Sequence, residues 1–202
     1  MRHLALLVVL LGLAGCRRAP APEPVPELPV LAAIPDFALV DQAGKPVTLA
    51  DLRGVPWVGV TFFTSCRTIC PGLLKAQGAL QSRLLAEHRR GRLVSLTVDP
   101  ENDDVARLQQ VALRLHADPA RWSFLTGDYA VIRRVVVEGF LSAIGDKRAK
   151  VAMNDVDVDV THSGKLIVVD AAGNARFFAE PTTEGITQVL DALRRLETEP
   201  RR

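Results

Sequence analysis

Two cysteines four positions apart, Cys66 and Cys70, are the residues of this chain best suited to chemistry. They follow the apolar segment 57–63, and Pro71 after the second cysteine is typical of the first turn of a helix. A thiol at a helix N-terminus lies near unpaired N–H groups and the positive end of the helix dipole, which stabilise its thiolate. The pattern therefore predicts two reactive sulfurs at a strand–helix junction.

Three kinds of chemistry are open to such a pair. A structural disulfide would close a short loop and add only about 2 kcal/mol, which is little for a domain with a full core. A thiol–disulfide oxidoreductase of the thioredoxin type has two residues between its cysteines, whereas this chain has three. A metal site is the third interpretation, because two thiolates select Cu(I), zinc or iron–sulfur centres. A peroxiredoxin-type peroxidase is disfavoured, since its threonine is replaced by Phe63 or Arg67 three residues before each cysteine.

His162 is the candidate third ligand. Of the four histidines, His3 lies in an N-terminal apolar segment, and His88 and His116 lie near predicted helix ends. His162 precedes a predicted strand at 166–169, at a point that should face the cysteine-bearing helix. A lone histidine is more often a surface or core residue than a ligand, so both interpretations stay open on the residues alone.

The N-terminus resembles a bacterial lipoprotein signal. A positively charged start is followed by an apolar run from Leu4 to Ala14, too short to span a bilayer as a helix but typical of an export signal. Small residues then precede Cys16. We therefore expect residues 1–15 to be a signal peptide and Cys16 to be lipidated, which tethers the domain to a membrane of the cell envelope, facing the periplasm or the cell exterior.

Residues 16–33 form the lipid-anchored cysteine and a proline-rich linker, and residues 34–202 form one folded domain. The linker prolines favour extended polyproline geometry, which suits a spacer. The two cysteines left in the mature domain fit an oxidising compartment. A formal net charge of +2 gives no indication of nucleic acid as a partner.

The elements that must position the cysteines alternate between strands and helices. We expect an α/β protein with a thioredoxin-like fold, in which a central mixed sheet is flanked by helices and preceded by an N-terminal β-hairpin. The expected elements are a hairpin at 37–49, strands at 57–63 and 93–98, a hairpin at 166–178, and helices at 71–88, 104–115, 129–139 and 183–196. Residues 145–160 have no clear period and are expected to form a loop.

Several segments together resemble the Sco/SenC family of copper chaperones. Residues 62–71, FFTSCRTICP, are similar to the family's Cys-x-x-x-Cys-Pro motif. The segments SLTVDPEND, WSFLTG and HSGKLIVVDAAG, which begin at residues 95, 122 and 162, resemble further family segments in the same order. The resemblance covers roughly residues 34–195.

The resemblance implies a thioredoxin-like fold that holds copper, as Cu(I) or Cu(II), through Cys66, Cys70 and His162. It also implies that the chain assists assembly of the binuclear copper centre of cytochrome c oxidase, with the copper-centre subunit or other copper and thiol proteins as partners. Such a protein is a metallochaperone rather than an enzyme, although its redox-active cysteines allow thiol–disulfide exchange. Asp99 and Asp103 also match family positions, and we interpret them as turn and capping residues, with Asp104 as the alternative cap of the helix that ends near Leu115.

Two residues depart from the family pattern. Thr161 stands where a carboxylate usually precedes the histidine and orients its ring, and Asp157 and Asp159 are the nearest substitutes. Arg67 replaces a proline, and its charge should favour the thiolates and slightly disfavour Cu(II). The alternatives are an envelope thiol–disulfide reductase, or a redox or copper sensor, without metal delivery.

Overall fold

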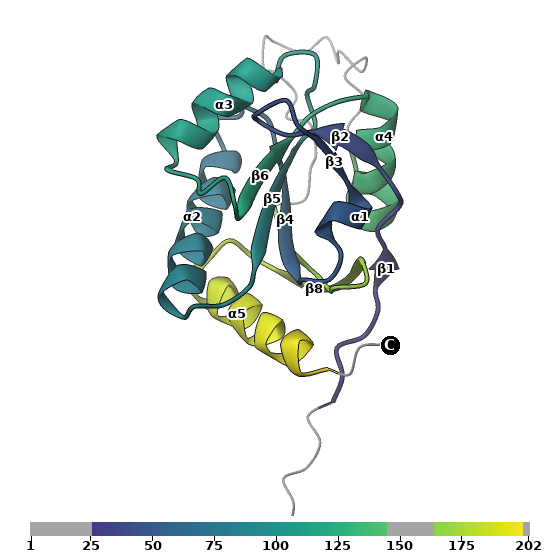
Figure 1. Ribbon diagram of the computed structural model, residues 1–202, viewed down its shortest axis with the longest axis vertical. Coiled ribbons are helices and arrows are strands. Elements are labelled where there is room, and N and C mark those ends of the chain that lie inside the picture. Colours follow the sequence, from purple (N-terminus) through teal and green to yellow (C-terminus); the bar gives the residue numbers. More distant parts are fainter. Residues whose placement is uncertain (1–25, 145–163, 200–202) are drawn as a thin grey trace, which may run out of the picture.

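A six-stranded mixed sheet forms the centre of the computed structural model, which describes residues 26–144 and 164–199. Its strand order is β1-β8-β7-β4-β5-β6, and β7 pairs antiparallel with β4. The strands β4, β5 and β6 run parallel (Figure 1). The strands are β1 (Ala32–Ala33), β4 (Trp57–Phe62), β5 (Arg92–Thr97), β6 (Trp122–Leu125), β7 (Leu166–Val169) and β8 (Asn174–Ala179). The expected mixed sheet with parallel central strands is confirmed.

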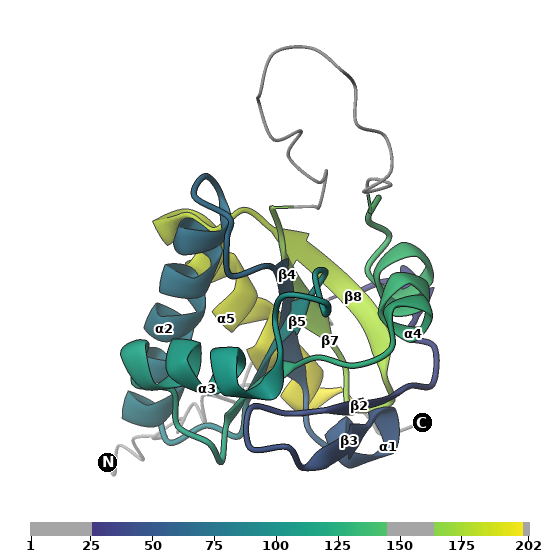
Figure 2. The same ribbon diagram turned by 90° about the horizontal axis from the view of Figure 1, so that it is seen from above.

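Helices and a hairpin cover the two faces of the sheet, as Figure 2 shows from above. One face packs against α2 (Cys70–Ala86), α3 (Val105–Arg114) and α5 (Thr183–Thr198). The other packs against the hairpin of β2 (Ala38–Val40) and β3 (Pro46–Thr48), the short α1 (Leu49–Leu52), and α4 (Tyr129–Arg134) with the π-helical turn η1 (Val135–Gly139). This layered arrangement is thioredoxin-like.

The alternation of side chains along β4 explains why this strand is central. Val58, Val60 and Phe62 join the cluster beneath α2 and α5, whereas Trp57 joins the cluster on the opposite face. Every residue of β4 is buried, because helices or the hairpin cover both faces. The strand is therefore a rigid support for whatever follows Phe62.

The predicted elements appear within a few residues of their expected bounds, with differences in four elements and at one boundary. The helix expected at 129–139 changes from α-helix to π-helix at Val135, and β1, α1 and β6 were not predicted as elements. The ordered fold also begins before the expected boundary at residue 34: Leu28 is buried in the core, and β1 pairs with β8. The loop expected at 145–160 lies outside the described residues.

Within the described ranges, none of the helices has the length and apolar character needed to cross a bilayer. The expected signal peptide at 1–15 and the lipidated Cys16 lie outside the described residues. Membrane attachment therefore remains a prediction from the sequence.

Candidate metal and thiol site

The cysteine motif lies where β4 passes into α2, as the sequence predicts. β4 ends at Phe62, a short loop carries Cys66, and α2 begins at Cys70 with Pro71 in its first turn. Cys70 is only 2% exposed, whereas Cys66 is partly exposed. The two sulfurs thus differ in access, and Cys66 is the one that a partner molecule reaches first.

Local hydrogen bonds favour ionisation of Cys66. Both cysteines are in the thiol form, and the backbone N–H of Cys70 donates to Cys66 Sγ over 3.4 Å. Thr68 Oγ1 lies 3.7 Å from the same sulfur. Partial burial raises the pKa of the Cys66 thiol, but hydrogen bonds from Cys70 and Thr68 together outweigh burial and lower its pKa. Hydrogen bonds to the sulfur of Cys66 therefore stabilise its thiolate form, the form expected from the sequence.

A buried carboxylate fixes the loop just before Cys66. Asp103 is 1% exposed and accepts hydrogen bonds from the backbone N–H and the hydroxyl of Thr64, at 3.0 and 2.5 Å. It also accepts from Thr97 Oγ1 at 2.6 Å, which ties the loop to the end of β5. Arg107 Nε donates to Thr64 Oγ1 over 2.8 Å. The loop is thus held from two neighbouring elements at a point two residues from the reactive sulfur.

This network corrects the sequence interpretation of one aspartate. The residue that caps α3 is Asp104, whose side chain accepts from the N–H of Arg107. Asp103 instead positions the cysteine loop, a role that we did not predict, as with Thr64. One feature of the sequence indicated this role: Asp103 directly precedes Asp104, and Asp104 alone is enough to cap the helix. Asp99 accepts two hydrogen bonds from Asn102 and serves the turn, as expected.

The segment that carries His162 lies outside the described residues, as do Thr161, Asp157 and Asp159. Gly164, the first described residue after that gap, lies beside the cysteine motif: a Cβ placed on it would be 3.5 Å from Ile69 Cδ1. β7 then starts at the same end of the sheet where β4 finishes, because the two strands are antiparallel. In the part of the chain that the structure describes, no three His, Cys, Asp or Glu residues gather closely enough for a metal ion. The three-ligand set thus remains a prediction.

A groove of about 350 Å³ opens next to the cysteines. Both Cys66 and Cys70 line it, together with apolar side chains of the loop, α2 and α3. Any molecule that occupies the groove therefore lies against the sulfurs.

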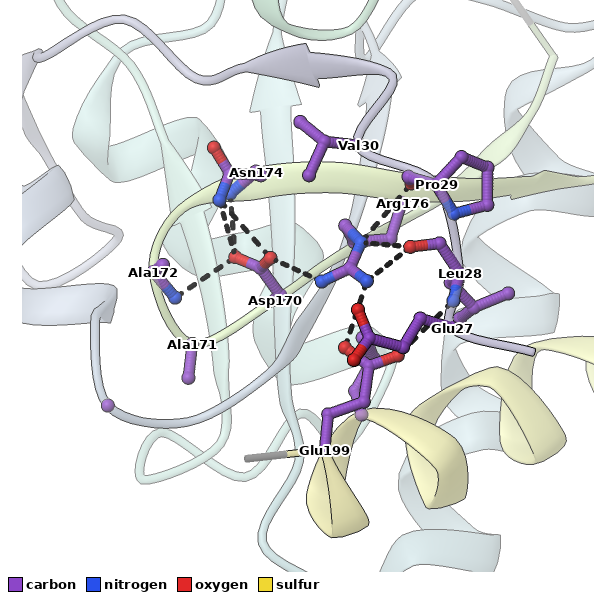
Figure 3. A pocket seen from close by; sticks show the side chains of 12 residues that line it. Glu27, Leu28, Pro29, Val30, Asp170, Ala171, Ala172, Asn174, Arg176 and Glu199 are labelled. Carbon is purple, nitrogen blue, oxygen red and sulfur yellow. Dashed lines mark hydrogen bonds and ion pairs between the residues drawn. The ribbon is translucent and has the colours of Figure 1, made fainter. Parts of the chain in front are cut away.

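A larger cavity of about 550 Å³ lies at the opposite end of the sheet and contains no cysteine. Figure 3 shows Arg176 at its centre, between the N-terminal segment and the end of α5. Its guanidinium pairs with Asp170 at 2.8 Å and Glu199 at 2.9 Å, and its Nε donates to the carbonyl of Leu28 at 3.0 Å. Arg176 and its two carboxylate partners satisfy one another's charges, and together they hold the N-terminal segment in place; we call this group the clamp.

Comparisons with known sequences and structures agree with the resemblance. The SCO1/SenC family pattern matches residues 28–197. A Stutzerimonas stutzeri protein with a provisional name as a copper-binding protein is 33% identical over 81% of this chain and 78% of its own length. A SCO1 homolog of Bacillus subtilis is 40% identical over 45% of this chain and 47% of its own length, so this match spans about half of that relative.

Solved structures with the same fold include a SCO1/SenC family lipoprotein from Bacillus anthracis, with a TM-score of 0.73 and 25% identity over 82% of this chain and 95% of that chain. BsSco, described as a member of the Sco family of cytochrome c oxidase assembly proteins, has a TM-score of 0.73 and 24% identity over 87% of this chain and 100% of its own. The likeness extends over the strands and helices that carry the cysteine motif.

Proposed function

Because this chain belongs to the SCO1/SenC family, we propose that it carries copper through Cys66, Cys70 and His162 for assembly of the binuclear copper centre of cytochrome c oxidase. The observation that carries the proposal is the pair of thiols at the β4–α2 junction, with the chain at Gly164 beside them. Gly164 follows His162 by two positions, and its contact with Ile69 of the cysteine motif supports this ligand set.

The donor set suits copper as cargo. Two thiolates favour Cu(I), and an added imidazole makes Cu(II) acceptable. Binding requires deprotonated sulfurs, so affinity falls as the pH is lowered. Copper passes to a partner by ligand exchange with that partner's cysteines. Alternatively, the two thiols reduce a partner's disulfide: two electrons and two protons pass to the partner, and a disulfide forms between Cys66 and Cys70.

The proposed location is the cell envelope, with Cys16 lipidated and the proline-rich residues between it and Leu28 as spacer. The apolar run that ends at small residues before Cys16 supports this proposal. Mass measurement of the chain isolated from bacterial membranes tests it, because lipidation removes residues 1–15 and adds a diacylglyceryl group to the cysteine sulfur. A mature chain that keeps residues 1–15 would contradict it.

Copper titration of the reduced full chain tests the ligand set. We expect about one copper per chain, and His162→Ala should weaken Cu(II) binding far more than Cu(I) binding, since two thiolates alone satisfy the softer ion. His116→Asn is the matched control: this exposed histidine has a positive φ of 51°, which asparagine tolerates. Equal Cu(II) affinity in the His162→Ala variant and the control would remove His162 from the site.

A thiol–disulfide reductase without metal is the second candidate. The lowered pKa and partial exposure of Cys66 favour it, because both properties suit a nucleophilic thiol. The visible spectrum after addition of Cu(II) to reduced protein separates the two functions. A thiolate-to-copper charge-transfer band that is lost in Cys66→Ser supports copper binding, and its absence favours the reductase.

A further inference from the structure

The groove beside the cysteines has an apolar interior. Phe62 and Val111 are buried at its base, and Leu74 and Leu115 are partly exposed along its sides. Cys66 belongs to the same lining. At about 350 Å³, the groove has the volume of a few amino-acid side chains, and an apolar side chain placed in it would lie against the reactive sulfur.

The rim of this groove carries positive charge that none of the described residues neutralises. Lys75 of α2 and Arg114 of α3 line it, and Arg67 lies in the cysteine loop. All three are exposed, and none of them takes part in an ion pair with another described residue. Some exposed arginines elsewhere in the described chain, such as Arg53 and Arg194, do have acidic partners.

Among the described residues, the helices and loop around the groove also lack acidic side chains. Neither α2, α3 nor the loop at 63–69 contains Asp or Glu. The nearest carboxylates at the start of α3 are already engaged, because Asp103 holds Thr64 and Asp104 caps the helix. The groove is therefore apolar inside and cationic at the rim, which is complementary to an apolar segment with acidic neighbours.

We propose that this groove docks the cysteine-bearing segment of a partner protein, with an apolar side chain of that segment inside and carboxylates paired with Lys75 and Arg114. The inference rests on the proposed function, since it names the surface through which copper or thiol exchange with a partner takes place. Docking brings the partner's cysteine to Cys66 because that sulfur is part of the groove wall.

The test measures how fast Cys66 exchanges with short peptide disulfides. The full chain with Cys16→Ser and Cys70→Ser keeps Cys66 as its only thiol. The probes are five-residue peptides with a central cysteine capped by thionitrobenzoate. The Cys66 thiolate attacks the peptide sulfur, a Cys66–peptide disulfide forms, and thionitrobenzoate leaves with the electron pair of the broken bond, so each exchange releases one coloured thiolate. One peptide has leucines next to the cysteine and glutamates at its ends, a second replaces the leucines by glycines, and a third replaces the glutamates by lysines.

We expect the acidic leucine peptide to react about tenfold faster at low salt than either of the other two. Lys75→Glu with Arg114→Glu should abolish this advantage and favour the lysine peptide. Arg133→Glu is the matched control, because Arg133 is an exposed arginine of α4, on the other side of the sheet, and pairs with no acidic side chain in the described part of the chain. The uncharged reagent dithiodipyridine should react equally with all variants, which shows that the thiol itself is unchanged.

Equal rates for the leucine and glycine acidic peptides would overturn the proposal, because long-range attraction alone would then explain the preference. Binding of the full chain to phosphatidylcholine vesicles with and without phosphatidylglycerol is measured in parallel. If the double charge reversal weakens vesicle binding but leaves the peptide rates unchanged, the surface is a membrane contact and the proposal is wrong. Copper titration of the double charge-reversal variant, with all three cysteines present, separates failure of the docking proposal from failure of the proposed function. Normal copper binding by a protein that does not distinguish the peptides would contradict the docking groove alone. A protein that distinguishes the peptides but binds no copper would contradict the copper function.

Discussion

At the residue scale, the position of Cys66 depends on a carboxylate that is distant in sequence. Asp103 accepts from two groups of Thr64 and one of Thr97, and it is buried. Removing an acceptor from such a network leaves buried donors without partners, which costs more than the bonds themselves contribute. Substitution of Asp103 should therefore destabilise the loop before Cys66 as much as substitution of a core residue would.

We expect Asp103→Asn to reduce the free energy of unfolding by about 1–3 kcal/mol, because the amide presents a donor where Thr64 and Thr97 need an acceptor. Alkylation of Cys66 in the folded protein should change rate in the same variant. Asp104→Asn is the control, since asparagine caps a helix as well as aspartate does. Urea unfolding measures both variants, and equal stability of the two would show that Asp103 does not hold the loop.

At the element scale, β4 must approach its neighbours closely to carry the cysteine loop. A Cβ on Gly59 would lie 2.9 Å from Phe140 and 3.0 Å from Trp57, both large buried side chains. Gly72 in the first turns of α2 has nothing within 4 Å of such a Cβ. Gly59 is therefore required for close packing in the strand, whereas Gly72 only adds chain flexibility in the helix.

Gly59→Ala should destabilise the fold by about 1–3 kcal/mol through overpacking. Gly72→Ala should instead stabilise it by about 0.5–1 kcal/mol, because alanine is the better helix former and no contact opposes it. Thermal unfolding of both variants is the measurement. A neutral Gly59→Ala would mean that Phe140, which follows the π-helical turn η1, moves easily away from β4.

At the scale of the whole molecule, the N-terminal segment and the cysteines lie at opposite ends of the sheet. Arg176 binds Leu28 and Asp170, and Asp170 follows the end of β7 that pairs with Trp57 at the start of β4. The cysteine loop follows the other end of β4, roughly 20 Å away at about 3.3 Å per residue. If the chain is anchored through Cys16, the clamp therefore turns the thiols away from the membrane.

Arg176→Met should lower the free energy of unfolding by about 3–5 kcal/mol, because buried Asp170 and partly exposed Glu199 would remain without their cation. Arg194→Met removes an arginine whose side chain is 48% exposed and should cost less than about 1 kcal/mol. Limited proteolysis near residue 28 should also accelerate in Arg176→Met alone. Similar losses in both variants would contradict the clamp.

The same clamp predicts a pH dependence. Burial raises the pKa of Asp170, but hydrogen bonds from Asn174 and Arg176 outweigh burial and lower it. A carboxyl group with a lowered folded-state pKa contributes stability above its ordinary pKa and loses it as the pH falls. The free energy of unfolding of the wild type should therefore decline below about pH 4, and less steeply in Arg176→Met. Parallel slopes in the two proteins would show that Arg176 does not lower the pKa of Asp170.

The sequence by itself determined the elements and the cysteine motif, because apolar periodicity, β-branched runs and Pro71 are local signals that need no knowledge of distant residues. It also placed Cys66 and Cys70 at a strand–helix junction, which the structure confirms. The short β1 and α1 escaped prediction, since two to four residues carry no periodic pattern.

Only the tertiary structure decided which distant residues meet around the thiols. Asp103 and Thr64 lie 39 positions apart. Val111 of α3 and Leu115 just after that helix line the same groove as Cys66 only because β4 and β5 are adjacent parallel strands. No local pattern encodes such contacts, because they depend on how strands pair and how helices cross over them. The cationic groove and the clamp at Arg176 arise from the same packing, since each joins elements that a linear chain keeps far apart.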